Sequence, residues 1–144
     1  MTSTELENLS RLGKLKRERA TQAEFDGLVR SGRTRLEDAQ NPELALESRF
    51  DLAYNGSHAL ALAALRWHGF RSDSRYAVFQ ALPHTLGLGP QVWRVLDKAH
   101  SLRNMSEYEG YADLDERLLE DVVRAGRTLE AAVGALGPIQ PTPG

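Results

Sequence analysis

The residues best suited to chemistry lie close together, in the segment from His100 to Gly110. His100, Arg103 and Asn104 stand three and four positions apart, so on a helix their side chains share one face. A guanidinium can hold a phosphate through two parallel hydrogen bonds, and an imidazole that titrates near neutral pH can accept a proton from a ribose hydroxyl. This combination is therefore suited to an RNA ligand, with Arg103 as the principal anion-binding residue.

The same segment also allows a purely structural interpretation. Arg103 could bind the last carbonyl groups of its own helix and form an ion pair with Glu107, while Tyr108 packs under the loop that follows. On this alternative the segment only stabilises the fold.

Other kinds of site have little support in the sequence. With no cysteine, thiolate metal sites, disulfides and cysteine nucleophiles are excluded. The segment from Gly87 to Gly89 follows a predicted helix and precedes no Lys-Ser/Thr pair, so it predicts a turn and not a phosphate-binding loop. We expect no metal and no cofactor, because the four histidines form no ligand motif: His58, His68, His84 and His100.

Helices are expected to position these residues. The chain has 144 residues, 41% hydrophobic and 26% charged, which is ordinary for one globular domain. Leu, Ala, Arg and Glu dominate, and no useful length alternates apolar and polar residues as a strand would. We predict an all-α, antiparallel bundle of about five helices within residues 21–136: 22–40, 42–68, 74–86, 91–106 and about 113–136. Residues 1–20 are expected to be an N-terminal helix (4–20) or arm, and residues 137–144 a disordered tail.

Several local signals set the helix ends. Thr21 and Glu24 have the spacing of a capping box, Asn41 followed by a proline is typical of a helix start, and Gly69 of a helix stop. Residues 59–65 are apolar on more than one side of their helix, so this helix is either central in the bundle or faces a partner subunit. Together with Trp67 and Trp93, these residues are candidate surface for a dimer interface.

Charge and hydropathy limit the kinds of partner that this chain can have. The formal net charge of −2 argues against a protein that coats nucleic acid through bulk charge. Residues 11–19 nevertheless hold five basic residues and one acidic residue, and such a basic arm could contact RNA or DNA. The longest notable apolar run, residues 59–65, is too short to span a bilayer, and the first 20 residues contain no apolar core typical of a secretory signal. We expect no membrane contact and a cytoplasmic location.

Four stretches of the chain resemble the HEPN domain (higher eukaryotes and prokaryotes nucleotide-binding). These stretches are residues 48–58, residues 59–71, residues 76–87 and the run Leu102-Arg-Asn-Met-Ser-Glu-Tyr108, and the resemblance covers roughly residues 27–136. The last run is the most specific.

The resemblance implies a helical bundle that is usually a homodimer. Many HEPN proteins are metal-independent endoribonucleases of toxin–antitoxin, phage-defence or CRISPR-associated systems, in which an Arg and a following His meet across the dimer cleft. Arg103 matches the Arg, but Tyr108 stands at the His position, and no His follows His100. A phenol with a pKa of about 10 is a poor general base at neutral pH. The chain thus resembles the R-N-x-x-E/D-Y branch, which lacks the usual catalytic His.

The expected function follows from this resemblance. We expect a prokaryotic, non-catalytic component of a toxin–antitoxin or defence-type system that binds RNA or a cognate toxin or antitoxin protein. Arg103, Asn104 and Tyr108 would bind the nucleic acid or anion, and Tyr108 would either stack on a base or position Arg103. One alternative is a metal-independent endoribonuclease acting at a dimer cleft, with Arg103, His100 and Tyr108 as catalytic candidates. A structural dimeric scaffold is the other.

Overall fold

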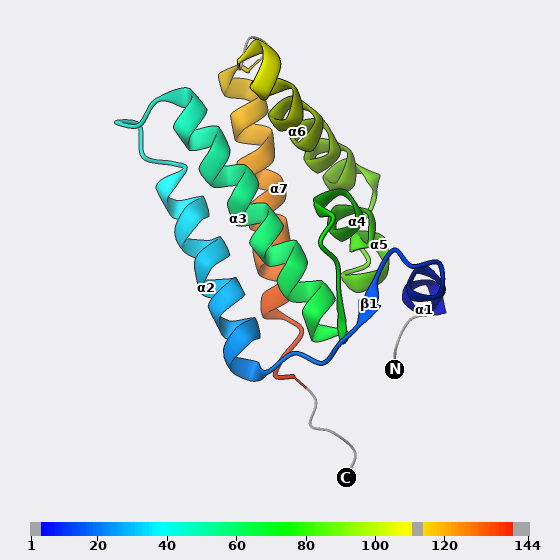
Figure 1. Cartoon of the computed structure of the whole chain (residues 1–144). Coiled ribbons are helices and arrows are strands. Elements are labelled where there is room, and N and C mark those ends of the chain that lie inside the picture. The colour runs from blue at the N-terminus through cyan, green and yellow to red at the C-terminus, as the bar shows by residue number, and fades with distance from the viewer. Residues whose placement is uncertain (1–3, 111–113, 140–144) are drawn as a thin grey trace.

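Helices make up most of the computed structural model, which describes residues 4–110 and 114–139 and, for 106–109, the backbone alone (Figure 1). The described part forms seven helices: α1 (Thr4–Arg11), α2 (Gln22–Asp38), α3 (Leu46–Trp67), α4 (Arg75–Gln80), α5 (Leu82–Thr85), α6 (Pro90–Glu109) and α7 (Glu116–Gly134). Two short strands, β1 (Lys16–Arg17) and β2 (Phe70–Arg71), pair antiparallel. The predicted all-α helical bundle is confirmed.

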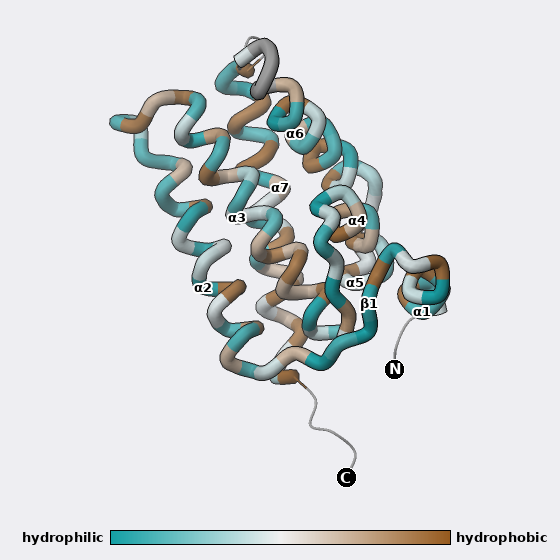
Figure 2. Tube along the Cα trace, in the orientation of Figure 1, coloured by the Kyte–Doolittle hydropathy of each residue, from teal (hydrophilic) through white to brown (hydrophobic). Residues whose placement is uncertain are grey.

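The central element is α3, which contacts α2 and α7 along much of its length and also touches α4, α5 and α6. In Figure 1 the four long helices α2, α3, α7 and α6 lie side by side, with α4 and α5 beside the lower half of α6. Figure 2 shows hydrophobic residues recurring along α3 and α7, whereas α2 is more hydrophilic. The core therefore forms around α3, because this helix has neighbours on several sides.

This position explains the apolar run at residues 59–65. Leu60, Ala61 and Leu65 are fully buried, and Leu62 packs against the same core. The run is apolar all round because its helix is central in its own chain. The alternative that this helix is central in the bundle therefore holds, and the buried residues of the run supply no surface for a dimer interface; for Trp67 and Trp93, both half-buried, the role stays a prediction.

Close packing of α2 against α3 depends on two glycines. A Cβ atom added at Gly32 would lie 2.9 Å from the carbonyl oxygen of Gly56 and 2.6 Å from Cγ of Leu60. Such distances leave no room for a larger side chain, so the two backbones approach one another directly.

The N-terminal segment differs from its prediction. The first helix ends at Arg11 instead of residue 20, and Gly13 turns the chain with a φ of 78°. The chain then pairs with β2 as a strand, which sequence periodicity did not indicate. Leu6 and Leu15 are buried in the main core, so this segment is part of the bundle and not a free arm.

Two further helix boundaries are corrected. Asn41 does not begin α3; its side-chain oxygen accepts a hydrogen bond from the backbone N–H of Glu43 (3.0 Å), which makes a turn, and the helix begins at Leu46. The helix expected over residues 74–86, with a kink or an end at Pro83, breaks two residues earlier, at Ala81, into α4 and α5, and Pro83 lies in the first turn of α5, where its missing N–H costs no hydrogen bond.

Other end signals hold. The Thr21 hydroxyl accepts from the backbone N–H of Glu24 (3.1 Å), and Gly69 ends α3 with a φ of 86°. Asp115 caps α7 by accepting from the Leu118 N–H (2.8 Å), whereas the expected start near Asp113 falls outside the described residues.

The first part of the expected tail is attached to the bundle. The indole N–H of Trp67 donates to the carbonyl of Gly137 (3.2 Å), and the backbone N–H of Ile139 donates to the side chain of Gln22 (2.7 Å). Disorder is therefore contradicted as far as Ile139. Residues 140–144 lie outside the described residues.

Candidate anion-binding site

The centre of the candidate site is the ring of Tyr54, a fully buried residue of α3. Its ring meets that of Phe79 edge-on, with the two centroids 5.8 Å apart, and it stacks against Phe50 at 6.4 Å. The Tyr54 hydroxyl lies 2.9 Å from Nδ1 of His100. Aromatic packing on one side and a hydrogen bond at the tip fix this ring, which gives other groups a rigid surface to pack on.

Two guanidinium groups from different helices pack against this ring. The Cζ atom of Arg75, in α4, and that of Arg103, in α6, each lie 5.4 Å from the centroid of the Tyr54 ring. Both distances are within the range of a cation–π interaction. Arg75 also donates to the side-chain oxygen of Asn55 (2.8 Å), and both arginines are half-buried. The fold thus brings two fixed positive charges to one aromatic ring.

Local structure explains how Arg75 reaches this position. Ser74 caps α4, since its hydroxyl accepts from the backbone N–H of Ala77 (3.2 Å). Arg75 is consequently the first residue of that helix, with Asn55 of α3 opposite it.

His100 is held from both ring nitrogens. Nδ1 faces the Tyr54 hydroxyl, and Nε2 lies 3.3 Å from the amide nitrogen of Asn104, one helical turn later. With the amide in this orientation Asn104 donates to Nε2, so the proton of a neutral ring sits on Nδ1. Burial lowers the pKa of His100; nearby Arg103 and Arg75 lower it further, against an opposing effect of Asp97.

His58, on the next turn of α3 after Tyr54, is also an uncharged group at neutral pH. Burial, and after it the charge of Arg75, lower its pKa from 6.5 to about 4. Its ring meets that of Phe79 edge-on, with the centroids 5.7 Å apart. A general acid or base works best with a pKa near the operating pH, so His58 is poorly matched to proton transfer.

The structure places the candidates from the sequence as follows. His100, Arg103 and Asn104 share one face of α6, as their spacing predicts; His100 and Arg103 contact Tyr54, and Asn104 contacts His100. Tyr108 lies in α6 by its backbone, but its side chain is outside the described part of the structure, as is that of Glu107. The roles suggested for Tyr108, and the Arg103–Glu107 ion pair, stay predictions.

Sequence reasoning missed three residues of this cluster. Tyr54 and His58 are four positions apart on one helix, so their shared face was visible in the sequence although their partners were not. No signal pointed to Arg75, because it belongs to another helix and joins the cluster only through the fold.

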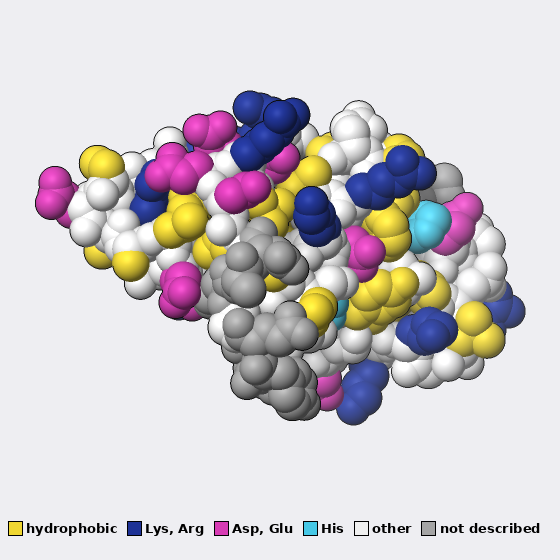
Figure 3. Space-filling view, turned by 90° about the horizontal axis from the view of Figure 1, so that it is seen from above, with side chains coloured by type: hydrophobic (Ala, Val, Ile, Leu, Met, Phe, Trp, Pro, Cys, Tyr) yellow, Lys and Arg dark blue, Asp and Glu magenta, His cyan; other side chains and the backbone are white. Residues whose placement is uncertain are grey.

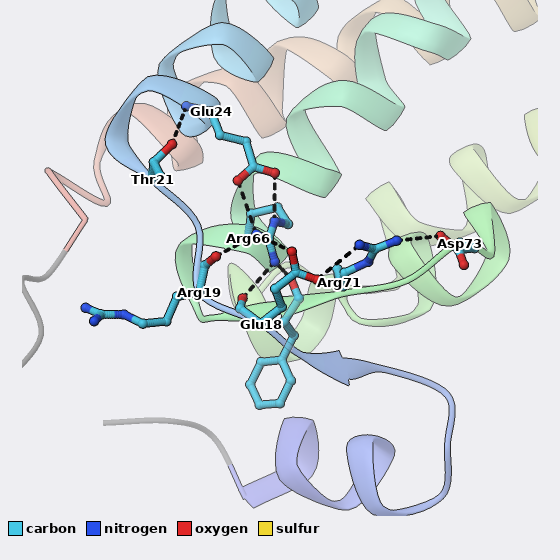
Figure 4. A network of polar contacts seen from close by, with 8 residues as sticks. Glu18, Arg19, Thr21, Glu24, Arg66, Arg71 and Asp73 are labelled. Carbon is cyan, nitrogen blue, oxygen red and sulfur yellow. Dashed lines mark hydrogen bonds and ion pairs between the residues drawn. The ribbon is translucent and has the colours of Figure 1, made fainter.

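A different arginine, Arg66, shows what a fully satisfied cation looks like in this chain (Figure 4). It is 3% exposed, and its guanidinium donates to both carboxylate oxygens of Glu24, each at 3.1 Å. It also donates to the backbone carbonyls of Glu18 (2.7 Å), Arg19 (3.0 Å) and Phe70 (3.1 Å). The Arg66 network therefore ties the end of α3 to the start of α2 and to β2, and it is structural.

Basic side chains do not form one continuous patch on the end of the molecule that Figure 3 shows. On the end of the molecule seen in Figure 3, lysines and arginines lie in several separate groups, with acidic and apolar side chains between them.

Within residues 4–110 and 114–139 no group of three or more His, Asp and Glu side chains could hold a metal ion. No helix of the described part is long and apolar enough to span a membrane.

No protein-family model, no curated protein and no solved structure matches this chain. Its function is therefore inferred from the residues described above, together with the resemblance in its sequence.

Proposed function

We propose that this chain is a non-catalytic component of a toxin–antitoxin or defence-type system, and that it binds nucleic acid by holding a phosphate group at Arg75 and Arg103. The observation that carries this proposal is that two guanidinium groups pack on one ring, each with its Cζ atom 5.4 Å from the centroid of Tyr54. The system type comes from the resemblance to HEPN domains alone.

The physical basis is electrostatic. The charges of both arginines act on His58 and on His100, and a phosphate bound at these guanidinium groups would be held through charge-assisted hydrogen bonds. Because the Tyr54 ring orients both guanidinium groups, little side-chain entropy is lost when the anion binds. Asn104, exposed on the same face of α6, offers an amide for a further hydrogen bond to sugar or phosphate.

The histidines favour binding over cleavage. Both ring nitrogens of His100 already have partners in Tyr54 and Asn104. With its lowered pKa, His58 is a weak base and holds almost no proton to donate at neutral pH. Cleavage of RNA through the attack of a 2′-hydroxyl needs a group that can take that proton, and neither imidazole is arranged for this role.

We extend the proposal to a cytoplasmic protein that acts as a homodimer or with a cognate toxin or antitoxin, as the sequence resemblance implies. Light scattering on the purified chain tests the dimer: a monomeric mass would contradict it.

Binding of a labelled single-stranded RNA tests the proposed function. We expect Arg103→Gln and Arg75→Gln each to weaken binding about tenfold and to reduce its dependence on salt. Arg30→Gln is the matched control: Arg30 is exposed on α2, outside the site, and its loss removes the same charge. The control should bind almost as the native protein does.

Other outcomes would favour the alternatives. RNA cleaved by the native protein but not by Arg103→Gln would make the chain an endoribonuclease. Unchanged RNA binding in both site variants, or a loss of several kcal/mol of stability in Arg103→Gln, would favour a structural role for Arg103.

A further inference from the structure

A basic pocket lies next to the candidate anion-binding site, on the outer side of α4. Its volume is about 340 Å³, and it lies between the N-terminal segment, the turn after β2 and one face of α4. The residues that give it its chemistry are Lys14, Lys16, Arg71, Asp73, Tyr76 and Gln80.

The charge available in this pocket comes from the two lysines. Arg71 is already paired with Glu18 (3.0 Å) and Asp73 (3.2 Å), so its charge is balanced inside the chain. Lys14 and Lys16 are exposed, and neither forms an ion pair with a carboxylate of the described residues. Strand β1 places Lys16 opposite Arg71, which holds its backbone against the bundle. Two ammonium groups at this pocket are thus available to a ligand.

Tyr76 joins this pocket to the candidate site. Its side chain lines the pocket and is 44% exposed, which is unusual for a large aromatic ring on a folded surface. On the other side its ring centroid lies 6.3 Å from that of His100, and Arg75 precedes it in α4. An exposed aromatic ring therefore stands between two positively charged sites, one made by arginines and one by lysines.

We propose that the Lys14–Lys16 pocket is a second phosphate subsite, so that one single-stranded nucleic acid lies across Tyr76 and contacts both sites. This inference rests on the proposed function, since it takes the Arg75–Arg103 site as the first phosphate subsite. A base would stack on the Tyr76 ring, and the phosphates on either side of it would meet the two groups of cations. The ligand is then a strand with at least two phosphates, and a mononucleotide occupies only the first subsite.

The aromatic ring decides between nucleic acid and an acidic peptide. Both ligands would satisfy the cations, but a carboxylate-rich segment gains nothing from a flat ring held between two charged sites. A base has a π-face at every position of the strand, and stacking on an exposed aromatic side chain is a principal means of binding single strands. A duplex buries its bases and cannot stack in this way.

The test compares an oligouridine of about 10 nucleotides with uridine monophosphate. We expect Lys14→Gln/Lys16→Gln to weaken oligouridine binding about tenfold and to lower the slope of log affinity against log salt by about 0.7, because one phosphate no longer meets the lysines. Monophosphate binding should stay unchanged in this variant. Arg30→Gln/Arg124→Gln removes the same charge from exposed positions on α2 and α7 and should bind oligouridine nearly as the native chain does.

Each failure has its own signature. If the lysine variant keeps native affinity while Arg103→Gln loses it, the second subsite is refuted and the proposed function stands. If the native chain binds neither probe, the proposed function fails as well. If a glutamate peptide of equal charge competes as well as oligouridine, or if Tyr76→Ser binds oligouridine as the native chain does, the ligand is not a stacked single strand.

Discussion

Arg66 and the Arg75–Arg103 pair are two arginine sites at α3 whose guanidinium groups have different partners. Arg66 is almost fully buried and meets a bidentate carboxylate and three backbone carbonyls. Arg75 and Arg103 are half-buried and pack on an aromatic ring, in an environment that also lowers the pKa values of two histidines.

The difference shows how to separate a structural cation from a candidate binding cation. A buried guanidinium is tolerated only when its donors are satisfied within the fold, because removing a charge from water is expensive. At the Tyr54 ring, two half-buried arginines from different helices each place their Cζ atom 5.4 Å from the ring centroid. On this contrast we base the proposal that the Arg75–Arg103 pair binds an external anion.

The largest expected effect is on the Arg66 side of the comparison. We expect Arg66→Ala to lower the free energy of unfolding by about 3 kcal/mol, because the hydrogen bonds that the buried guanidinium donates to Glu24 and to three backbone carbonyls are lost. Arg66→Lys should recover only part of this loss, since an ammonium cannot form the same fork of hydrogen bonds. Urea unfolding at neutral pH measures both variants, with Arg103→Gln, expected to cost about 1 kcal/mol, as the reference. Equal costs for Arg66→Ala and Arg103→Gln would remove the distinction between the two regions.

The next largest effect is the pH dependence of stability caused by His58, which lies near Tyr54. The pKa of His58 falls from 6.5 in the unfolded chain to about 4 in the fold, so between these values the unfolded state binds the additional proton. Stability due to the neutral imidazole is therefore full above pH 6.5 and is lost as the pH falls toward 4.

Between pH 7 and pH 5 this loss should amount to about 2 kcal/mol. Urea unfolding of the native chain and of His58→Gln at both pH values measures it, because only the native chain has the titrating group. If the two proteins lose stability in parallel, the pKa of His58 is not lowered in the fold.

The smallest effect tests the hydrogen bond between Tyr54 and His100. Tyr54→Phe keeps the ring on which both arginines pack but removes the hydroxyl that faces Nδ1 of His100. We expect a loss of about 1 kcal/mol in stability and less than about a twofold change in RNA binding. A large loss of binding in this variant would mean that the position of His100, and not the two guanidinium groups, determines affinity.

The sequence predicted those features of the fold that depend on residues close together in the chain. The helical class and the caps at Thr21 and Gly69 were correctly predicted, because they depend on residues within a few positions of each other. The start at Asn41 was wrong, since the same asparagine can equally close a turn. The N-terminal helix was predicted too long, because pairing with β2 involves residues far away in the chain.

The candidate site divides in the same way. The sequence by itself determined that His100, Arg103 and Asn104 share a helix face, and that the central helix is apolar on several sides, because helical periodicity is a property of neighbouring residues. Only the tertiary structure decided that Arg75 joins Arg103 at the Tyr54 ring, that His58 is kept uncharged, and that the guanidinium of Arg66 is hydrogen-bonded within its own chain. These outcomes depend on burial and on charges from separate helices, and no spacing along the chain contains that information.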